Sequence, residues 1–258
     1  MSHSTHRKSS TWLGCLVLAA VSTATLQAAS DSPQPTSQAV LVELFTSEGC
    51  SSCPPADRLL IELDRQQPVS GTTIVVLSEH VDYWDPEGWR DPFSSHLWTD
   101  RQNEYGRQFG LANVYTPQIV IDGQRQTSGG DGRAVLSAIE QSAKAPRIDI
   151  AISSLERAGD GVHVGLTAGA AKGATLYAVL ADDADHSSVQ RGENAGRTLD
   201  HVAVARSFIR VGKLDKSPLD QKLVIPIPPG TPDRRLRLIV FAQDGHSGHI
   251  VGVAAREL

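Results

Sequence analysis

An apolar run that ends in a Cys-x-x-Cys motif constrains this chain more than any other feature. Residues 39–45, Ala-Val-Leu-Val-Glu-Leu-Phe, predict a buried strand. A short loop follows, and Cys50 and Cys53 then lead into a predicted helix. A vicinal cysteine pair between a strand and a helix is a local arrangement used for thiol-disulfide exchange. We therefore expect Cys50 and Cys53 to form a redox-active pair.

A Cys-x-x-Cys pair has two other common uses, a zinc site and a structural disulfide. The chain has 3 cysteines, and Cys15 falls in the N-terminal segment described below, which leaves one pair in the mature protein. A structural zinc site needs a second pair of ligands, and the nearest candidates, His246 and His249, lie in a distant Gly-rich segment. A disulfide that staples so short a loop contributes only about 2 kcal/mol. Exchange chemistry explains the spacing better than either use.

Residues 1–29 have the pattern of a secretory signal peptide. Arg7 and Lys8 precede an apolar run over 12–21, and small residues suitable for cleavage end the segment. The run is shorter than the ~20 apolar residues that span a bilayer, and no later segment reaches that length. We expect a secreted or periplasmic protein without a membrane span, with its cysteines in an oxidising compartment.

The net charge of the chain bears on which kind of macromolecule it binds. Cleavage removes Arg7 and Lys8 and no acidic residue, so the formal net charge changes from -5 to -7. An acidic chain without a basic run argues against nucleic acid. We expect protein thiols or disulfides as partners and no cofactor, and the sequence leaves the oligomeric state open.

Three segments follow the signal peptide. Residues 30–38 predict a polar, flexible leader. Residues 39–145 alternate between strands and helices, which predicts a parallel βαβ unit and then a hairpin and a final helix. The expected strands are 39–45, 72–78, 115–123 and 124–128, and the expected helices are 53–66, 94–109 and 133–144.

This order of elements resembles the thioredoxin fold. The resemblance implies a cis-proline opposite the dithiol. Pro117, directly before an apolar strand, occupies the matching position. With a cis bond, Thr116 would offer its backbone to a partner peptide beside Cys50. The alternative is an ordinary trans bond at the first residue of an edge strand.

Most of the mature chain also resembles a family of bacterial secreted thioredoxin-like proteins of unknown function that carry a Cys-x-x-Cys-Pro-Pro motif. The stretches that carry this resemblance are 43–57, 80–85, 91–95, 115–118 and 191–199. The resemblance implies an α/β thioredoxin-like domain. It leaves the activity open, because the family has no settled function.

The motif differs from that of thioredoxin in the residues between and after the two cysteines. Ser51 and Ser52 replace the Gly-Pro usual between the cysteines, and two prolines follow Cys53. Because proline fits only the first turn of a helix, the helix should begin near Ser52 or Cys53. We expect Cys50 to be exposed just before it, where free N–H groups favour a thiolate. Cys50 is then the nucleophile and Cys53 resolves the mixed disulfide.

Other side chains are candidates for the same site. Glu43 interrupts a buried strand seven residues before Cys50. A desolvated carboxylate there would accept the proton of Cys53, and the alternative is an acid at an exposed sheet edge. His80 ends the second strand, at the edge where α/β sheets place their sites, and with Trp84 it would line a substrate cleft. The alternatives are that His80 is a hydrogen-bonded structural group and that Trp84 anchors the loop.

A second function class also remains open. The chain would then be a non-catalytic binding module, for a partner protein or for copper. The copper ligands would be Cys50, Cys53 and His80, since thiolates and imidazole suit that metal.

Residues 146–258 predict a C-terminal antiparallel β-sandwich domain. Apolar and polar residues alternate there with period two, between Gly, Asp and Pro turns. The alternating segments are 147–152, 162–166, 175–180, 222–225, 236–241 and 249–253. Residues 191–206 gather charged and polar side chains in one hairpin, which either faces the cleft of the first domain or forms a structural ion-pair network.

Overall fold

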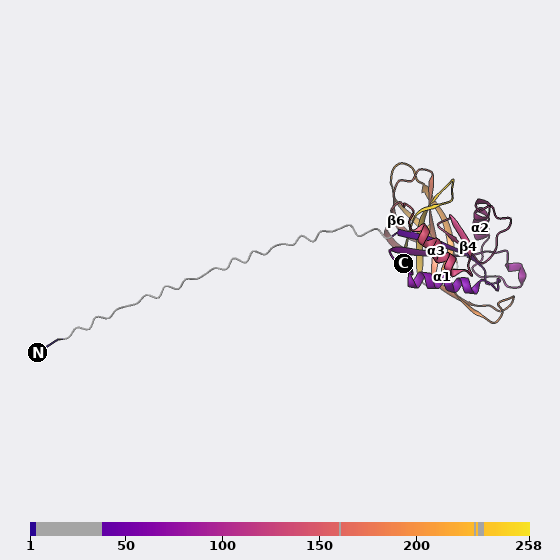
Figure 1. Cartoon of the computed structure of the whole chain (residues 1–258), viewed down its shortest axis with the longest axis horizontal. Coiled ribbons are helices and arrows are strands. Elements are labelled where there is room, and N and C mark those ends of the chain that lie inside the picture. Colours follow the sequence, from indigo (N-terminus) through magenta and orange to yellow (C-terminus); the bar gives the residue numbers. More distant parts are fainter. Residues whose placement is uncertain (4–37, 160, 230, 232–234) are drawn as a thin grey trace. The chain divides into compact units, whose positions relative to one another are not determined.

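The computed structural model describes residues 1–3, 38–159, 161–229, 231 and 235–258 (Figure 1). The chain forms two units, Met1–Thr36 and Ser37–Leu258, and all the helices and strands given below belong to the second. The predicted signal peptide and leader fall almost entirely on residues 4–37, outside the described residues.

The first half of the second unit alternates between strands and helices in the predicted order. Its elements are β1 (Gln38–Thr46), α1 (Pro54–Gln66), β2 (Thr72–His80), the short 3-10 helix η1 (Asp85–Glu87), α2 (His96–Gln108), β3 (Gln118–Ile121), β4 (Arg125–Ser128) and α3 (Gly132–Ser142). The bounds differ from the predicted ones by a few residues.

Local chemistry explains where the helices begin. Pro54 and Pro55 occupy the first turn of α1, where their missing N–H groups leave no helical bond unmade. The side chain of Ser95 accepts from the N–H of Leu97 at the start of α2, and Asp131 does the same for Ala134 at the start of α3. Both are ordinary N-caps.

The second half consists of strands. They are β5 (Ile150–Ala158), β6 (Gly161–Ala168), β7 (Ala174–Ser188), β8 (Thr198–Lys213), β9 (Leu219–Pro226), β10 (Leu236–Asp244) and β11 (Ile250–Glu257). Six of them contain or overlap a segment that the alternation predicted. The long strand β8 was not predicted, because its first residues were interpreted only as part of a charged hairpin.

One eight-stranded sheet contains strands from both halves, in the order β11-β10-β7-β8-β2-β1-β3-β4. β1 and β2 are parallel, β3 is antiparallel to β1, and β4 is antiparallel to β3. β8 lies beside β2 with Ser78 opposite Val204, and Figure 1 shows the orange and yellow strands beside the purple ones. The structure thus differs from the expected pair of separate domains: Ser37–Leu258 is one compact unit.

A second sheet, β5-β6-β9, packs on the C-terminal strands of the first. Alternate residues of β10 face opposite ways. Leu238 and Val240 pack with Val164 and Leu166 of β6, whereas Ile239 and Phe241 belong to the core of the first half. The C-terminal strands therefore form two layers, one of which belongs to the sheet shared with the N-terminal half.

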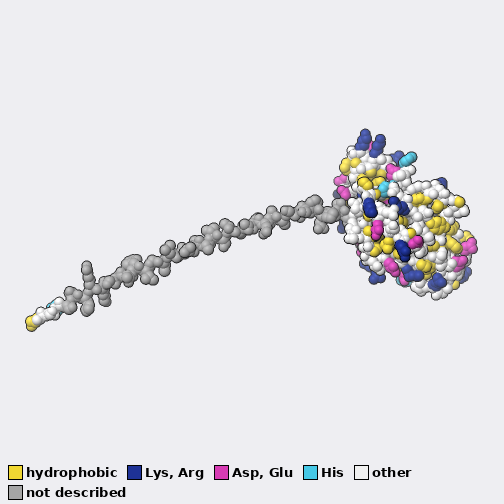
Figure 2. All heavy atoms as spheres, viewed as in Figure 1, with side chains coloured by type: hydrophobic (Ala, Val, Ile, Leu, Met, Phe, Trp, Pro, Cys, Tyr) yellow, Lys and Arg dark blue, Asp and Glu magenta, His cyan; other side chains and the backbone are white. Residues whose placement is uncertain are grey.

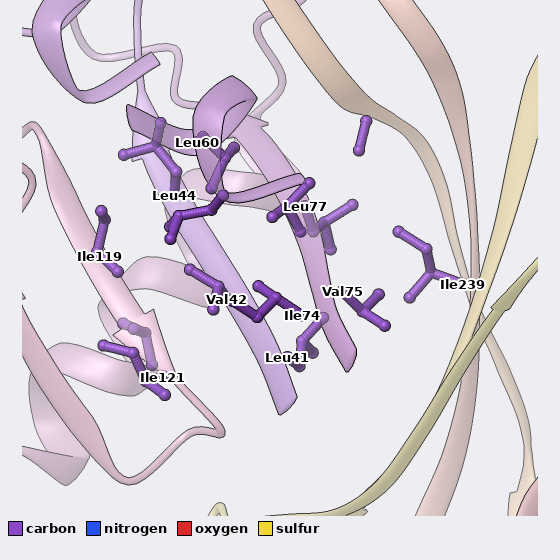
Figure 3. Packing of buried hydrophobic residues seen from close by; sticks show 14 of the residues in the cluster. Leu41, Val42, Leu44, Leu60, Ile74, Val75, Leu77, Ile119, Ile121 and Ile239 are labelled. Atoms are coloured by element: carbon purple, nitrogen blue, oxygen red, sulfur yellow. The ribbon is translucent and has the colours of Figure 1, made fainter. Parts of the chain in front are cut away.

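The two faces of β1 meet different helices. Thr46 bonds to Asp57 of α1, whereas Glu43 bonds to Arg101 of α2. Apolar side chains fill the space between, and Figure 3 shows Leu44 and Leu60 among those from β1, α1, β2 and β3. The end of β1 and the start of α1 are thereby fixed in position.

No helix among the described residues is long and apolar enough to cross a membrane. On the face shown in Figure 2, acidic and basic side chains are interspersed among uncharged ones.

Candidate functional site

Cys50 and Cys53 form a disulfide between the end of β1 and the start of α1. Their Cα atoms lie 5.4 Å apart. The N–H of Cys50 donates to the carbonyl of Ser47 at 3.1 Å, and the N–H of Cys53 donates to the carbonyl of Cys50 at 3.2 Å. Cys53 is the N-cap residue of α1, and its carbonyl accepts from Ala56 and Asp57. The motif is therefore held in a tight turn that runs into the helix.

Both cysteines are buried. The exposed fraction is 0% for Cys50 and for Cys53, although Ser51 and Ser52 between them are exposed. The prediction that Cys50 is exposed ahead of the helix is wrong. The reason is long-range: residues 189–197, which connect β7 to β8 and are called the covering loop below, bond to the backbone on either side of Cys50.

Asn194 is the centre of that contact. Its side-chain amide donates to the carbonyl of Glu48 and to the carbonyl of Cys50, both at 2.9 Å, and the residue is 0% exposed. The guanidinium of Arg197 donates to its Oδ1 at 3.0 Å. Beside it, the carboxylate of Glu193 accepts from the N–H of Ser51 at 3.1 Å. The covering loop thus contacts the motif through polar groups.

Glu48, two residues before Cys50, is an ordered and fully buried acid. Its Oε2 accepts from the indole N–H of Trp89 at 2.8 Å, and its Oε1 accepts from the hydroxyl of Ser187. Its backbone N–H donates to Asp91 at 2.8 Å. Glu48 therefore connects the motif with the 81–95 segment and with β7.

His201 of β8 balances the charge of two of these acids. Its Nε2 lies 3.3 Å from Oε1 of Glu48, and its Nδ1 lies 3.7 Å from Oδ1 of Asp57, a distance suited to an ion pair but too long for a hydrogen bond. Burial lowers the pKa of His201, but Asp57 and Glu48 outweigh it and raise the pKa to about 10. A buried imidazolium therefore lies between two carboxylates at neutral pH.

His80 is buried next to this group and does not line an open cleft. Its Nδ1 lies 2.7 Å from Oδ2 of Asp91, and its ring meets the ring of His201 edge to face at 4.7 Å. Burial raises the pKa of Asp91, but His80 and the N–H groups of Glu48 and Phe93 lower it further than burial raises it. Nε2 of His80 has no hydrogen-bond partner among the described residues.

Glu43 is buried as its predicted role requires, but it has other partners. Its carboxylate accepts from Nε of Arg101 and from the hydroxyl of Tyr105, both at 2.7 Å. Glu79 shares the same guanidinium at 3.3 Å, and burial next to Glu43 raises its pKa. Since Glu43 faces α2, the buried acid on the α1 side of β1 is Asp57.

Thr116 and Pro117 are joined by a cis peptide bond, as predicted. Pro117 is buried against Gly129: a Cβ at Gly129 would lie 3.0 Å from Cβ of Pro117 and 2.5 Å from Cβ of Ala56. The cis-proline is therefore close to the first turn of α1. Trp84 connects to the same place, because its indole N–H donates to Oγ1 of Thr116 at 2.8 Å.

Trp84 also approaches the turn that holds the disulfide. A Cβ at Gly49 would lie 3.0 Å from Cβ of Trp84. A larger residue at position 49 would have to displace this tryptophan, which gives a steric reason for the glycine. Trp84 thus lies against the turn that holds the disulfide and bonds to Thr116, whereas His80 and Glu43 lie in buried clusters.

Sequence patterns alone do not identify most of the other residues of this site. Asp57 follows Cys53 by four residues, which places both on one face of α1, and that spacing was a usable signal. Glu48, Asp91 and Asn194 lie within the stretches that carried the family resemblance. His201 lies in the segment 191–206, which predicts a charged hairpin and reveals neither the burial of His201 nor its two acid partners.

The copper alternative gains no support from the arrangement. The two sulfurs are bonded to each other, and Nδ1 of His80 is taken by Asp91. Within the described ranges, no group of three or more His, Cys, Asp or Glu side chains is placed to hold a metal ion.

Comparison with known proteins identifies the family. Residues 41–243 match the family described as Protein of unknown function (DUF1223), so the chain belongs to that family. No curated protein matches this sequence.

Among solved structures, the chain is similar to the crystal structure of protein AGR_C_4864 from Agrobacterium tumefaciens, with 28% identity and a TM-score of 0.64. The match covers 85% of this chain and 93% of that one, which supports the fold described above. The sporulation control protein Spo0M from Bacillus subtilis matches with 9% identity and a TM-score of 0.27, over 43% of this chain and 46% of that one. A TM-score this low supports no conclusion about the fold or the function.

Proposed function

We propose that the protein is a thiol-disulfide oxidoreductase whose reacting group is the Cys50–Cys53 pair. The observation that carries the proposal is the position of the disulfide, at the junction of β1 and the N-terminus of α1. Backbone N–H groups and the positive end of the helix dipole favour a thiolate there once the bond is reduced.

The surrounding topology supports a thioredoxin-like interpretation of the first half. β2-β1-β3-β4 form neighbouring strands, with β3 antiparallel to β1. α1 and α2 pack on opposite faces of β1, as the bonds of Thr46 and Glu43 indicate. We interpret β1 to α3 as a thioredoxin-like unit to which β8, β7, β10 and β11 have been added at the β2 edge.

The exchange begins from the oxidised pair. A partner thiolate attacks Sγ of Cys50, the bond to Cys53 breaks, and Cys53 leaves as a thiolate. A second partner thiolate attacks the partner sulfur of the mixed disulfide and releases the Cys50 thiolate. The partner dithiol becomes a disulfide, and its two electrons and two protons pass to the Cys50–Cys53 pair. The same steps run backward when a partner disulfide is reduced.

We assign to Asp57 the exchange of a proton with Cys53. It lies one helical turn beyond that residue, it is 5% exposed, and Oγ1 of Thr46 donates to it at 3.0 Å. His201 lies on its other side as a cation. This replaces the predicted role of Glu43, whose carboxylate is held by Arg101 and Tyr105.

Secretion forms part of the same proposal. The pattern of residues 1–29 supports export, and an exported protein meets partners in an oxidising compartment, where a disulfide persists or is passed on.

The reduction potential of the pair, measured against glutathione, tests the proposal. A potential above about -300 mV is expected for an exchanging pair, and one well below that value would mark a structural bond and overturn the function.

Trapping identifies the attacking sulfur. Cys53→Ala should accumulate a mixed disulfide with a cysteine-containing protein through Cys50, whereas the matched control Cys50→Ala should accumulate much less. Equal trapping by the two variants would contradict the assignment of Cys50 as nucleophile.

A further inference from the structure

The contact between the covering loop and the motif consists of hydrogen bonds to the backbone. Asn194 uses both N–H groups of its side-chain amide, one for the carbonyl of Glu48 and one for the carbonyl of Cys50. Two carbonyls that flank a reacting cysteine are thus occupied by donors from a residue 144 positions away from Cys50 in the sequence.

The loop is built to present this amide. The N–H of Val189 donates to the carbonyl of Arg197 at 2.9 Å, and the N–H of Gly196 donates to the carbonyl of Val189 at 2.8 Å, which closes the loop at its base. The N–H of Arg197 donates to the carbonyl of Asn194 at 3.1 Å. Because these bonds lie within the loop, the loop can move away from the motif without losing them.

Val189, which is 1% exposed, anchors the base of the covering loop. The bond between Glu193 and Ser51 joins two exposed residues, so water competes with it. Gly192 lies against Trp89, where an added Cβ would be 3.1 Å from Cβ of the tryptophan. Asn194 is the fully buried member of this group and makes two of its bonds to the motif.

We propose that Asn194 is a latch that keeps the disulfide closed and selects extended cysteine-containing peptides over small thiols. The inference rests on the proposed function. Exchange requires the covering loop to move, and its movement takes the Asn194 donor away from the carbonyls of Glu48 and Cys50; the carbonyl of Cys50 keeps its bond from the N–H of Cys53. An extended peptide replaces the lost bonds with its own backbone N–H groups, whereas a small thiol supplies fewer donors and leaves the carbonyl of Glu48 without a protein partner. Asn194 is therefore a positioning and specificity-determining residue.

The first experiment measures access to the disulfide with a water-soluble phosphine, which takes up oxygen from water as it reduces the bond to two thiols. Asn194→Ala removes two bonds of the closed state, so the rate of reduction should rise roughly tenfold. Asn113→Ala, a matched substitution at an exposed residue before β3, should leave the rate unchanged. Equal rates in wild type and Asn194→Ala would overturn the latch.

If Asn194→Ala folds poorly, hydrogen exchange of the wild-type protein provides a second test of the inference. If the covering loop must open, the N–H of Ser51 should exchange at least as fast as the phosphine reduces the disulfide. Exchange slower than reduction would show that the sulfurs are reached with the loop in place, and would overturn the latch.

Selectivity is measured with glutathione and an extended cysteine-containing peptide as competing thiols. The wild type should react faster with the peptide, and the ratio of the two rates should fall by several-fold in Asn194→Ala. An unchanged ratio would overturn the selectivity. The reduction potential separates this outcome from a failure of the proposed function. A potential well below about -300 mV would overturn the oxidoreductase function but would not affect the comparison of phosphine reduction rates.

Discussion

Raising the pH from 7 to 9 should destabilise the protein through His201. Its pKa is about 10 in the folded chain, against about 6.5 when unfolded. Because the folded value is the higher one, the stabilisation is fully present below about 6.5 and is lost as the pH rises through about 10. Between these values the folded state holds one more proton, so the free energy of unfolding falls by about 1.4 kcal/mol per pH unit. From pH 7 to 9 the loss is about 2.7 kcal/mol.

Urea unfolding at pH 7, 8 and 9, followed by tryptophan fluorescence, measures this slope. In His201→Gln the titrating group is absent, so the difference from wild type should shrink as the pH rises. At pH 7 the variant should be about 3 to 5 kcal/mol less stable than wild type, because Glu48 and Asp57 lose a buried cation. His246→Gln, at an exposed histidine, is the matched control and should follow the wild type.

Glu48 after β1, Asp57 on α1 and His80 on β2 lie next to His201, and Asp185 of β7 is opposite it in the sheet. If the wild type were equally stable at pH 7 and pH 9, His201 would not be held as a cation by these acids. The charge assignment of the whole buried cluster would then be refuted.

Two further substitutions test the rest of the fold. Arg101→Met removes the cation between Glu43 and Glu79 and should cost about 3 to 5 kcal/mol in urea unfolding, while the exposed Arg107→Met should cost little; a loss below about 1 kcal/mol would contradict the buried ion-pair interpretation. Gly123→Ala places a Cβ 2.1 Å from the carbonyl oxygen of Gly248 at a φ of 64°. It should lower the melting temperature more than Gly71→Ala, a control at a similar φ with open space around it. Equal losses of melting temperature in the two variants would mean that the contact between position 123 and Gly248 is easily relieved.

The parts of the fold that depend on neighbouring residues could be predicted from the sequence. The apolar run 39–45 is a strand for its whole length, and Pro54 and Pro55 mark the first turn of α1 because proline tolerates no other helical position. The turn at Cys50 and Cys53 follows from these two elements.

The burial of the site could not be predicted, because its cover comes from a distant part of the chain. No local pattern reveals that Asn194 bonds beside Cys50, and a histidine in a charged hairpin predicts solvent exposure as readily as burial. His201 is buried where it meets Glu48, which follows β1, and Asp57 of α1. The role of Glu43 was misplaced for a related reason: whether a strand residue faces α1 or α2 depends on the helix packing.

The continuous sheet makes the cysteine motif dependent on the whole folded chain. β8 supplies the strand beside β2, the cation beneath the motif and one end of the covering loop. A fragment that ends near residue 145 would expose the edge of β2 and leave Glu48 and Asp57 without the cation of His201. We therefore expect the first half to be unstable when it is separated from β8.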